Sequence, residues 1–233
     1  MIKVGICDEG QICRANIGKL VKKYFTKRSL EYQLREYESG KSFMEQGEKV
    51  DILLLDIEME GISGIQLKNW LNQKKSDTKI IFVTNHTEGM TEAFGRNVYG
   101  FLKKPPEPGE LEICLGRITE EIEENESLTI KSINQEFVIK IKNVFYFVSE
   151  KKYSRMVSGN GVHFCDMSLS QLEEKLKYQS FFRCHRSYLV NLRNIYCIKD
   201  NVCMKNGDVI PVSRRKVKNL KDSYQLYIEK KVQ

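Results

Sequence analysis

In the first half of the chain, short apolar segments alternate with segments in which apolar residues recur at helical spacing. There are five such apolar runs, of which EYQLREY is the weakest. Helix-like segments such as NIGKLVKKYF and GIQLKNWLNQKK lie between the runs. Parallel strands that helices cover on both faces have near-continuous apolar sequences. The alternation therefore predicts a doubly wound parallel α/β sheet over residues 1–122. The other four runs are IKVGIC (2–7), DILLLD (51–56), KIIFVT (79–84) and YGFLKK (99–104).

Acidic residues follow two of these runs at the point where each run ends. Asp8 and Glu9 come after the first run, and Asp56 closes the run at 51–56. In a doubly wound sheet the carboxyl ends of the strands lie at one edge, where ligands bind. Carboxylates gathered there repel one another unless a cation lies among them, and Mg²⁺ prefers oxygen ligands. We therefore expect a Mg²⁺ site at this edge.

Two further residues follow the remaining strands of the series. Thr84 ends the run at 79–84, and Lys104 stands before Pro105 after the last run. A hydroxyl and an ammonium group both suit the oxygens of a phosphoryl group. Taken singly, these residues are more simply explained as an ordinary strand threonine and a surface lysine, and the acids as helix caps. Their ordered set instead predicts an acyl phosphate at Asp56, whose carboxylate is the nucleophile.

The spacing of these residues resembles that of the receiver domains of response regulators, which have a flavodoxin-like fold. The resemblance covers residues 1 to about 122. It implies that Asp8, Glu9 and Asp56 ligate Mg²⁺ together with the backbone carbonyl of Glu58. It also implies that a sensor histidine kinase supplies the phosphoryl group.

The same resemblance implies a switch made of Thr84, Phe101 and Lys104, and a cis peptide bond between Lys104 and the proline that follows. The chain departs from the family at two positions. Glu60 stands where receivers usually have proline, and Pro106 follows the usual Lys-Pro pair. Neither departure removes a reacting group.

A strand-terminal aspartate is also the nucleophile of the haloacid-dehalogenase phosphatases, which act on external substrates. Those enzymes need a second aspartate two residues later as general acid, and Glu58 occupies that position here. No cap insertion is apparent either. The sequence therefore favours a phosphorylated regulator over an enzyme.

The second half of the chain differs from the first in charge and in periodicity. Residues 1–125 contain 18 Lys and Arg against 21 Asp and Glu, whereas residues 126–233 contain 20 against 10. Beyond a short linker at 123–127, segments such as SLTIKS and EFVIKIK alternate apolar and polar residues, as half-buried strands do. We predict a mainly β domain over 128–233, and its positive charge is typical of binding to a polyanion.

Local signals add detail to this β-rich domain. Ser168 with Gln171 predicts a capped helix, and Asn206-Gly207 predicts a hairpin turn, while a basic helix closes the chain. No helix-turn-helix, zinc finger or basic zipper is apparent. The richest basic stretch is FFRCHRSYLVNLRNI, where basic and polar residues interleave with apolar ones. On its own this pattern also fits a hydrophobic strand with a solvated basic face.

That stretch resembles the core signature of the LytTR DNA-binding domain, a β-sheet module found behind receivers. The resemblance spans about 128 to 230 and includes the YFVSEKKY and PVSRRKVKNL segments. It implies DNA contacts from loops at these three places, by position on Lys152 and Ser154, on Arg186 and on Arg215. The two arginines suit bidentate contact with guanine. We expect phosphate contacts from four basic residues, which are Lys151, Lys152, Arg155 and Arg214.

These features together predict a transcriptional response regulator. Its phosphorylation favours a homodimer, so that two LytTR modules bind paired repeats in double-stranded DNA with greater avidity. The alternative is a receiver-driven switch whose basic domain binds a protein or a membrane, although no Lys-rich amphipathic helix with exposed aromatic residues favours membrane binding. The seven cysteines form no CxxC pair, and no signal peptide or membrane span is apparent. We therefore expect a cytoplasmic protein with free thiols.

Overall fold

The computed structural model describes residues 1–46, 49–85, 90–132, 135–177 and 179–232. The chain divides into two compact units, Met1–Glu121 and Ile122–Gln233, each with its own core. Helix α5 continues to Asn125, so the segment predicted as a linker is mostly helical. No described helix is both long and apolar enough to cross a membrane.

The first unit is a five-stranded parallel sheet, as the sequence predicted, and its strands lie in the order β2-β1-β3-β4-β5. A short segment at 88–96, EGMTEAFGR, also has apolar residues at helical spacing; it forms the short helix α4, and residues 88 and 89 lie outside the described residues. The elements are β1 (Ile2–Cys7), α1 (Gln11–Lys27), β2 (Tyr32–Tyr37), α2 (Gly40–Gln46), β3 (Ile52–Leu55), α3 (Gly64–Gln73), β4 (Lys79–Thr84), α4 (Met90–Ala93), β5 (Val98–Lys103) and α5 (Pro108–Asn125).

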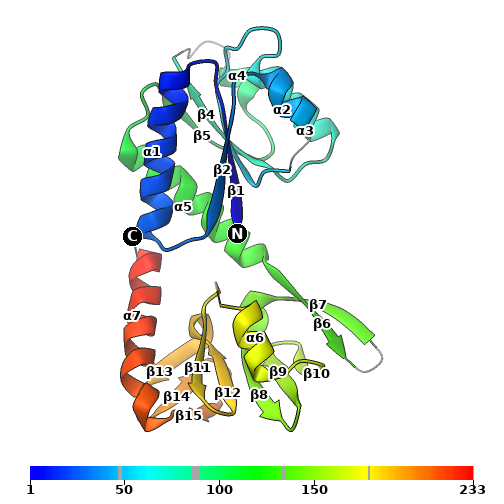
Figure 1. Cartoon of the computed structure of the whole chain (residues 1–233), viewed down its shortest axis with the longest axis vertical. Helices are drawn as coiled ribbons and strands as arrows, with labels where there is room; N and C mark the ends of the chain where they lie inside the picture. Colours follow the sequence, from blue (N-terminus) through cyan, green and yellow to red (C-terminus); the bar gives the residue numbers. More distant parts are fainter. Residues whose placement is uncertain (47–48, 86–89, 133–134, 178, 233) are drawn as a thin grey trace. The chain divides into compact units, whose positions relative to one another are not determined.

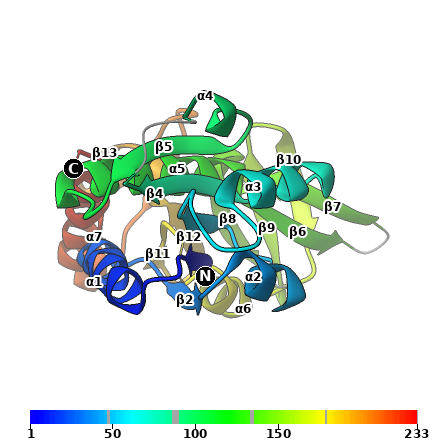
Figure 2. The same cartoon turned by 90° about the horizontal axis from the view of Figure 1, so that it is seen from above.

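Helices cover both faces of this sheet, which explains why its central strand β3 is apolar throughout. All four residues of β3 are buried. On one face, Phe43 of α2 and Leu67 of α3 join the core against the sheet. On the other face, α1 and α5 are linked by a 2.8 Å hydrogen bond between the Tyr24 and Thr119 hydroxyls. Figures 1 and 2 show α1 and α3 on opposite sides of the strands.

The start of α3 packs directly on the peptide that follows β3. A Cβ atom at Gly64 would lie 2.0 Å from the backbone oxygen of Asp56, so only glycine fits there. The Gly64 amide donates to the Ile57 carbonyl at 2.9 Å, and Ser63 caps the helix by a capping box with Gln66. This close approach fixes the backbone on which Asp56 stands.

The second unit is β-rich, with antiparallel sheets in the orders β10-β9-β8-β12-β11, β13-β14-β15 and β6-β7. The elements are β6 (Ser127–Ser132), β7 (Gln135–Lys140), the 3-10 turn η1 (Ile141–Asn143), β8 (Val144–Glu150), β9 (Tyr153–Ser158), β10 (Gly161–Cys165), α6 (Leu169–Lys175), β11 (Phe181–His185), β12 (Tyr188–Asn191), η2 (Leu192–Asn194), β13 (Ile195–Ile198), β14 (Asn201–Met204), β15 (Val209–Pro211), η3 (Arg214–Lys216) and α7 (Val217–Val232).

Two of the local signals in this half are confirmed. The Ser168 hydroxyl and the Gln171 side chain form a capping box at the start of α6. The turn between β14 and β15 contains Gly207 at φ 90°, the backbone conformation that glycine adopts without strain. Leu172 of α6 and Leu220 of α7 are fully buried in two separate apolar clusters. The two helices thus belong to separate apolar clusters of the same unit, although both contact β11. Figure 1 shows both helices beside the strands.

Candidate functional sites

The carboxyl ends of β1 and β3 bring two buried carboxylates beside one ammonium group. Lys104 Nζ lies 2.5 Å from Asp8 Oδ2 and 2.5 Å from Asp56 Oδ2. Only 3% of Asp8 and 8% of Asp56 is exposed. Buried like charges need a cation between them, and Lys104 supplies it. The structure therefore brings together three residues that the sequence placed at this edge of the sheet.

Lys104 is fixed by its backbone as well as by the two acids. Its amide donates to the Thr84 carbonyl at 3.1 Å, and its peptide bond to Pro105 is cis, as the family resemblance implied. Burial by itself lowers the pKa of Lys104, but hydrogen bonds to Asp56 and Asp8 outweigh burial and raise the pKa. The side chain is therefore cationic at neutral pH.

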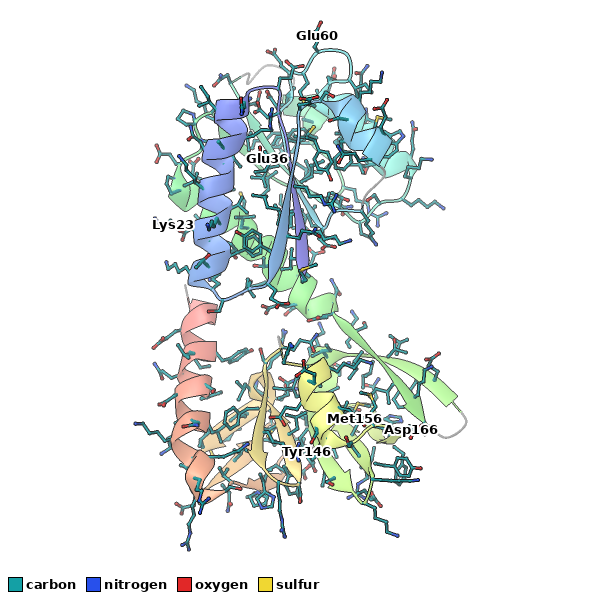
Figure 3. All side chains as sticks on the ribbon, in the orientation of Figure 1. Lys23, Glu36, Glu60, Tyr146, Met156 and Asp166 are labelled. Atoms are coloured by element: carbon teal, nitrogen blue, oxygen red, sulfur yellow. The ribbon has the colours of Figure 1, made fainter. Side chains whose placement is uncertain are left out.

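Asp8 is held by the turn that begins α1. The Gly10 amide donates to Asp8 Oδ1 at 2.8 Å. The Arg14 guanidinium donates to the backbone carbonyls of Asp8 and Glu9 at 2.6 and 3.0 Å, and its Nε lies 3.4 Å from the carboxylate of Glu36 on β2 (Figure 3). These contacts leave Asp8 Oδ2 directed at Lys104.

The side chain of Glu9 does not join this pair of aspartates. Its Oε1 accepts a hydrogen bond from the backbone amide of Glu60, which lies in the loop between β3 and α3 (Figure 3). Glu58 is exposed, and its amide donates to Asp56 Oδ1 at 3.3 Å. Glu9, Glu58 and Glu60 all line one surface hollow. The loop after β3 therefore adds negative charge around the buried site.

The predicted Mg²⁺ ligands are only partly assembled. In the part of the chain that the structure describes, no three acidic, histidine or cysteine side chains are grouped as metal ligands. The Glu9 carboxylate is bound to the backbone amide of Glu60 instead. Lys104 occupies the position between the carboxylates of Asp8 and Asp56. The two aspartates nevertheless fit Mg²⁺, since both direct a carboxylate oxygen at one cation position.

Thr84 and Phe101, two of the three predicted switch residues, lie on the adjacent strands β4 and β5. Thr84, at the end of β4, is only 2% exposed. The Phe101 ring on β5 stacks on Phe82 with centroids 5.3 Å apart and contacts the Phe94 ring at 4.7 Å. Phe94 itself is 64% exposed. Phe101 thus connects the interior of the sheet to an aromatic ring on the surface.

Lys68 on α3 holds the segment that carries Phe94. Its side chain is buried, and Nζ donates to the carbonyls of Glu92 at 2.6 Å and Phe94 at 3.3 Å. Because α4 ends at Ala93, these carbonyls lie at the helix end, where partners within the helix are missing. Burial lowers the pKa of Lys68, and the charge of Glu92 opposes that effect.

In the second unit, the turn between β8 and β9 exposes three of the predicted DNA-binding residues. Lys151, at φ 56°, and Lys152 form its exposed tip, and Lys152 Nζ lies 5.0 Å from the centre of the Tyr153 ring. Arg155 on β9 is also exposed, with its Nε 3.6 Å from Glu150 Oε2. This hairpin presents an exposed basic end.

Ser154 is not available for the predicted contact with DNA. It is fully buried, and its hydroxyl donates to the Met167 carbonyl at 2.7 Å. Alternate residues of a strand face the same side, and Ser154 shares its side with the buried Met156. The strand register therefore turns this residue into the domain, and we remove it from the candidate interface.

Arg186 is exposed in the turn between β11 and β12, and other cations hold that turn. Arg183 Nε donates to the His185 carbonyl at 2.9 Å, and its Nη2 donates to the Arg186 carbonyl. Lys216 Nζ in turn donates to the Arg183 carbonyl at 2.7 Å. The side chain of Arg183 therefore supports the turn, while Arg186 lies at its exposed end.

Two more polar residues of this basic stretch have structural contacts. Asn191 is buried and donates to the carbonyls of Ile141 and Val144 at 3.1 and 2.9 Å. Arg193 Nη2 lies 2.8 Å from Glu124 Oε1. Arg186 therefore remains the best-placed residue of this stretch for reaching a partner.

Arg214 and Arg215 are exposed in η3, immediately before α7. Arg214 lines a surface hollow together with Lys199 and Lys221. Clustered positive charge of this kind attracts polyanions. The third predicted loop is therefore exposed and basic.

Comparison with known proteins identifies both units. Residues 4–115 match the model of the response regulator receiver domain, and residues 134–225 match that of the LytTr DNA-binding domain. A response regulatory protein of Yersinia pestis is 34% identical over 74% of this chain and 78% of its own length. The transcriptional regulatory protein BtsR of Escherichia coli is 30% identical over 76% of this chain and 80% of its own length.

The chain is a DNA-binding two-component response regulator. A more distant relative, the sensory transduction protein LytT of Bacillus subtilis, is 26% identical over 95% of this chain and 98% of its own length. In this regulator a receiver domain is followed by a LytTR domain.

Three contacts of this response regulator were not predicted from its sequence. The bond from Glu60 to Glu9 needs a backbone N–H, which the proline usual at that position in receivers lacks. Lys68 lies on the buried face of α3, whereas a lysine normally reaches solvent. Arg183 belongs to a basic stretch but turns inward. The only sequence signals were the absent proline and a lysine between the apolar Leu67 and Leu71.

Proposed function

We propose that a sensor histidine kinase phosphorylates Asp56 and that this modification promotes dimerisation and binding to paired DNA repeats. The observation that carries the proposal is the position of Lys104, whose ammonium group is 2.5 Å from both Asp56 and Asp8. A carboxylate nucleophile, a neighbouring acid and a cation beside both are suited to acyl phosphate formation.

In this proposal an Asp56 oxygen attacks the phosphorus atom, and the bond from phosphorus to the kinase histidine breaks. Mg²⁺, held by Asp8, Asp56, Glu9 and the Glu58 carbonyl, would neutralise charge on the transferred group. Once phosphorylated, Asp56 no longer has a carboxylate charge next to Lys104. The Lys104 ammonium group therefore leaves the carboxylates and pairs with a phosphoryl oxygen. Thr84 donates its hydroxyl to another phosphoryl oxygen.

To donate to the phosphoryl group, the Thr84 side chain takes a new position. This change alters the packing of Phe101, which contacts Phe94 at the surface. A surface rearranged in this way alters the tendency of the receiver to self-associate. The receiver acts here as the recipient of a phosphoryl group, with no external substrate to turn over. Because the proposed function needs both a kinase and DNA, we propose that the protein acts in the cytoplasm.

On the DNA side, we propose that exposed cations of three loops form the interface. Arg186 and Arg215 read guanine edges, because a guanidinium group can donate to O6 and N7 together. The other contacts go to phosphates and set the orientation of the domain. They come from Lys151, Lys152, Arg155 and Arg214, all of which are exposed.

Acetyl phosphate with Mg²⁺ tests the acceptor directly, with intact-mass measurement of the full chain as the readout. We expect one phosphoryl group per chain, lost on treatment with hydroxylamine, and none on Asp56→Asn. Asp51→Asn is the matched control, since Asp51 lies just before β3 and accepts from the Lys3 amide at 2.8 Å instead. Labelling of Asp56→Asn to the level of the parent would reassign the acceptor.

A further inference from the structure

Two cysteines face each other across the β13–β14 hairpin. Cys197 on β13 is directly paired with Cys203 on β14, next to an irregularity in the register between Ile195 and Cys197. Paired residues of antiparallel strands have Cα atoms about 4.5 to 5.5 Å apart, which lies within the range of about 4.4 to 6.8 Å found in disulfides.

These thiols differ from the other cysteines in their access to solvent. Cys197 and Cys203 are half-exposed, whereas four of the remaining five are buried. On β14 the neighbours Val202 and Met204 are 0% and 2% exposed, so Cys203 lies on the outward side of its strand. Cys13 is also half-exposed, but it lies in the other unit.

We propose that Cys197 and Cys203 are a redox-active dithiol that forms a reversible disulfide by exchange with low-molecular-weight disulfides such as oxidised glutathione. The sequence had indicated only free thiols, because no CxxC pair is present. The pairing of the two strands supplies the proximity that sequence spacing does not reveal.

The exchange takes place in two steps. The Cys197 thiolate attacks one sulfur of oxidised glutathione, whose S–S bond breaks to release a glutathione thiolate that takes up a proton. Cys203 then loses its proton, and its thiolate attacks the Cys197 sulfur of the mixed disulfide and releases the second glutathione. The protein loses two hydrogen atoms, and one glutathione disulfide becomes two thiols.

The pairing of the two cysteines also bears on the order of the steps. The neighbouring Cys197 thiol raises the pKa of Cys203, whereas the nearby charge of Lys199 acts in the opposite direction. Cys203 therefore keeps its proton while Cys197 attacks, since the thiolate is the nucleophilic form. Once Cys197 is in a mixed disulfide, its thiol no longer raises the pKa of Cys203, and Cys203 becomes easier to deprotonate.

The pair lies close to the candidate DNA interface. The tip of the same hairpin consists of Lys199 and Asp200, and both residues line the basic hollow that includes Arg214. A disulfide between Cys197 and Cys203 would join the two strands just below this tip. The DNA-binding domain thus carries its oxidation site next to its own basic surface.

The test is a titration of the reduced full chain with oxidised glutathione, without oxygen, followed by intact-mass measurement and peptide mapping. We expect loss of two hydrogen atoms, a cross-link between the peptides that contain Cys197 and Cys203, and reversal by dithiothreitol. Cys197→Ser and Cys203→Ser each keep one glutathione at the remaining cysteine of the pair. Cys13→Ser is the matched control and should form the cross-link as the parent does.

Three results would overturn the proposal. One is a parent protein that accumulates glutathione on Cys197 or Cys203 without forming the cross-link. Another is a parent in which neither thiol reacts. The third is a cross-link that persists in either serine variant, which would mean that a different pair of cysteines is responsible.

Discussion

The backbone amide of Glu60 donates a hydrogen bond to the carboxylate of Glu9, joining the loops that follow β1 and β3. Glu9 is one of the proposed Mg²⁺ ligands, so this bond competes with metal binding. The competition depends on the backbone at position 60, because any residue except proline supplies the N–H.

Glu60→Pro should therefore bind Mg²⁺ more tightly than Glu60→Gln, which removes the same charge but keeps the amide. The loss of one competing hydrogen bond is worth about 1 kcal/mol, which corresponds to a roughly fivefold lower dissociation constant. Isothermal titration calorimetry with MgCl₂ on both variants measures the difference. Equal affinities would show that Glu9 does not need to leave Glu60 to bind the metal.

Lys68 should make the stability of the receiver depend on pH. Its pKa is lowered in the folded state, so the unfolded chain binds more protons between that pKa and the unfolded value of about 10.4. Stability therefore rises with pH across that window. Urea unfolding of the parent and of Lys68→Met between pH 7 and pH 10.5 isolates this contribution. The parent should gain stability relative to the variant as pH rises.

The fluorescence of Trp70 is a suitable readout for this experiment. It is the only tryptophan of the chain, and it packs against the receiver core, so its signal reports the unfolding of that unit within the full protein. A constant difference between parent and Lys68→Met at every pH would contradict the account of a buried, charged Lys68.

Arg183 should affect DNA affinity without touching DNA. Arg183→Lys retains the charge but loses the planar group that donates to the carbonyls of His185 and Arg186. We expect specific binding to weaken by about 1 to 3 kcal/mol with an unchanged salt slope, because the Arg186 turn loses its support. Fluorescence anisotropy across a salt series measures both quantities. Arg193→Lys, whose partner is Glu124, should bind as the parent does, and equal binding by Arg183→Lys would refute the positioning role.

Base readers and phosphate contacts should respond differently to substitution. Arg186→Ala and Arg215→Ala should each cost roughly 1 to 3 kcal/mol on the preferred site and reduce discrimination at particular base pairs. Lys151→Ala should weaken all sequences about equally and lower the salt slope by roughly one. Competition binding with single-base variants of the site separates the two patterns. If the arginine variants behave as Lys151→Ala does, neither arginine reads bases.

The parallel sheet was predictable because its strands are buried on both faces, and a run such as ILLL leaves few alternatives. The meeting of Asp8, Asp56 and Lys104 was predictable for a topological reason. Each residue ends a different parallel strand, and the carboxyl ends of parallel strands share one edge. Local order in the sequence was therefore enough to assemble the centre of the site.

Other features depend on contacts that no local pattern encodes. The prediction that Ser154 contacts DNA was wrong because the register of β9 turns its hydroxyl toward the Met167 carbonyl. Arg183 points inward because the carbonyls of His185 and Arg186, in the turn between β11 and β12, accept hydrogen bonds from its guanidinium group. The pairing of Cys197 with Cys203 depends on where the β13–β14 hairpin turns, and that position follows from the fold of the whole domain.

The measurement that tests the central claim most directly is the DNA affinity of the full chain before and after phosphorylation, on duplexes with one repeat and with two. Phosphorylation of Asp56 should tighten binding to paired repeats by about 100-fold or more, because the second contact becomes intramolecular, and should leave single-repeat binding nearly unchanged. Asp56→Asn treated in the same way should show neither effect. Equal affinity of the phosphorylated and unphosphorylated chains for paired repeats would contradict the claim that Asp56 controls DNA binding.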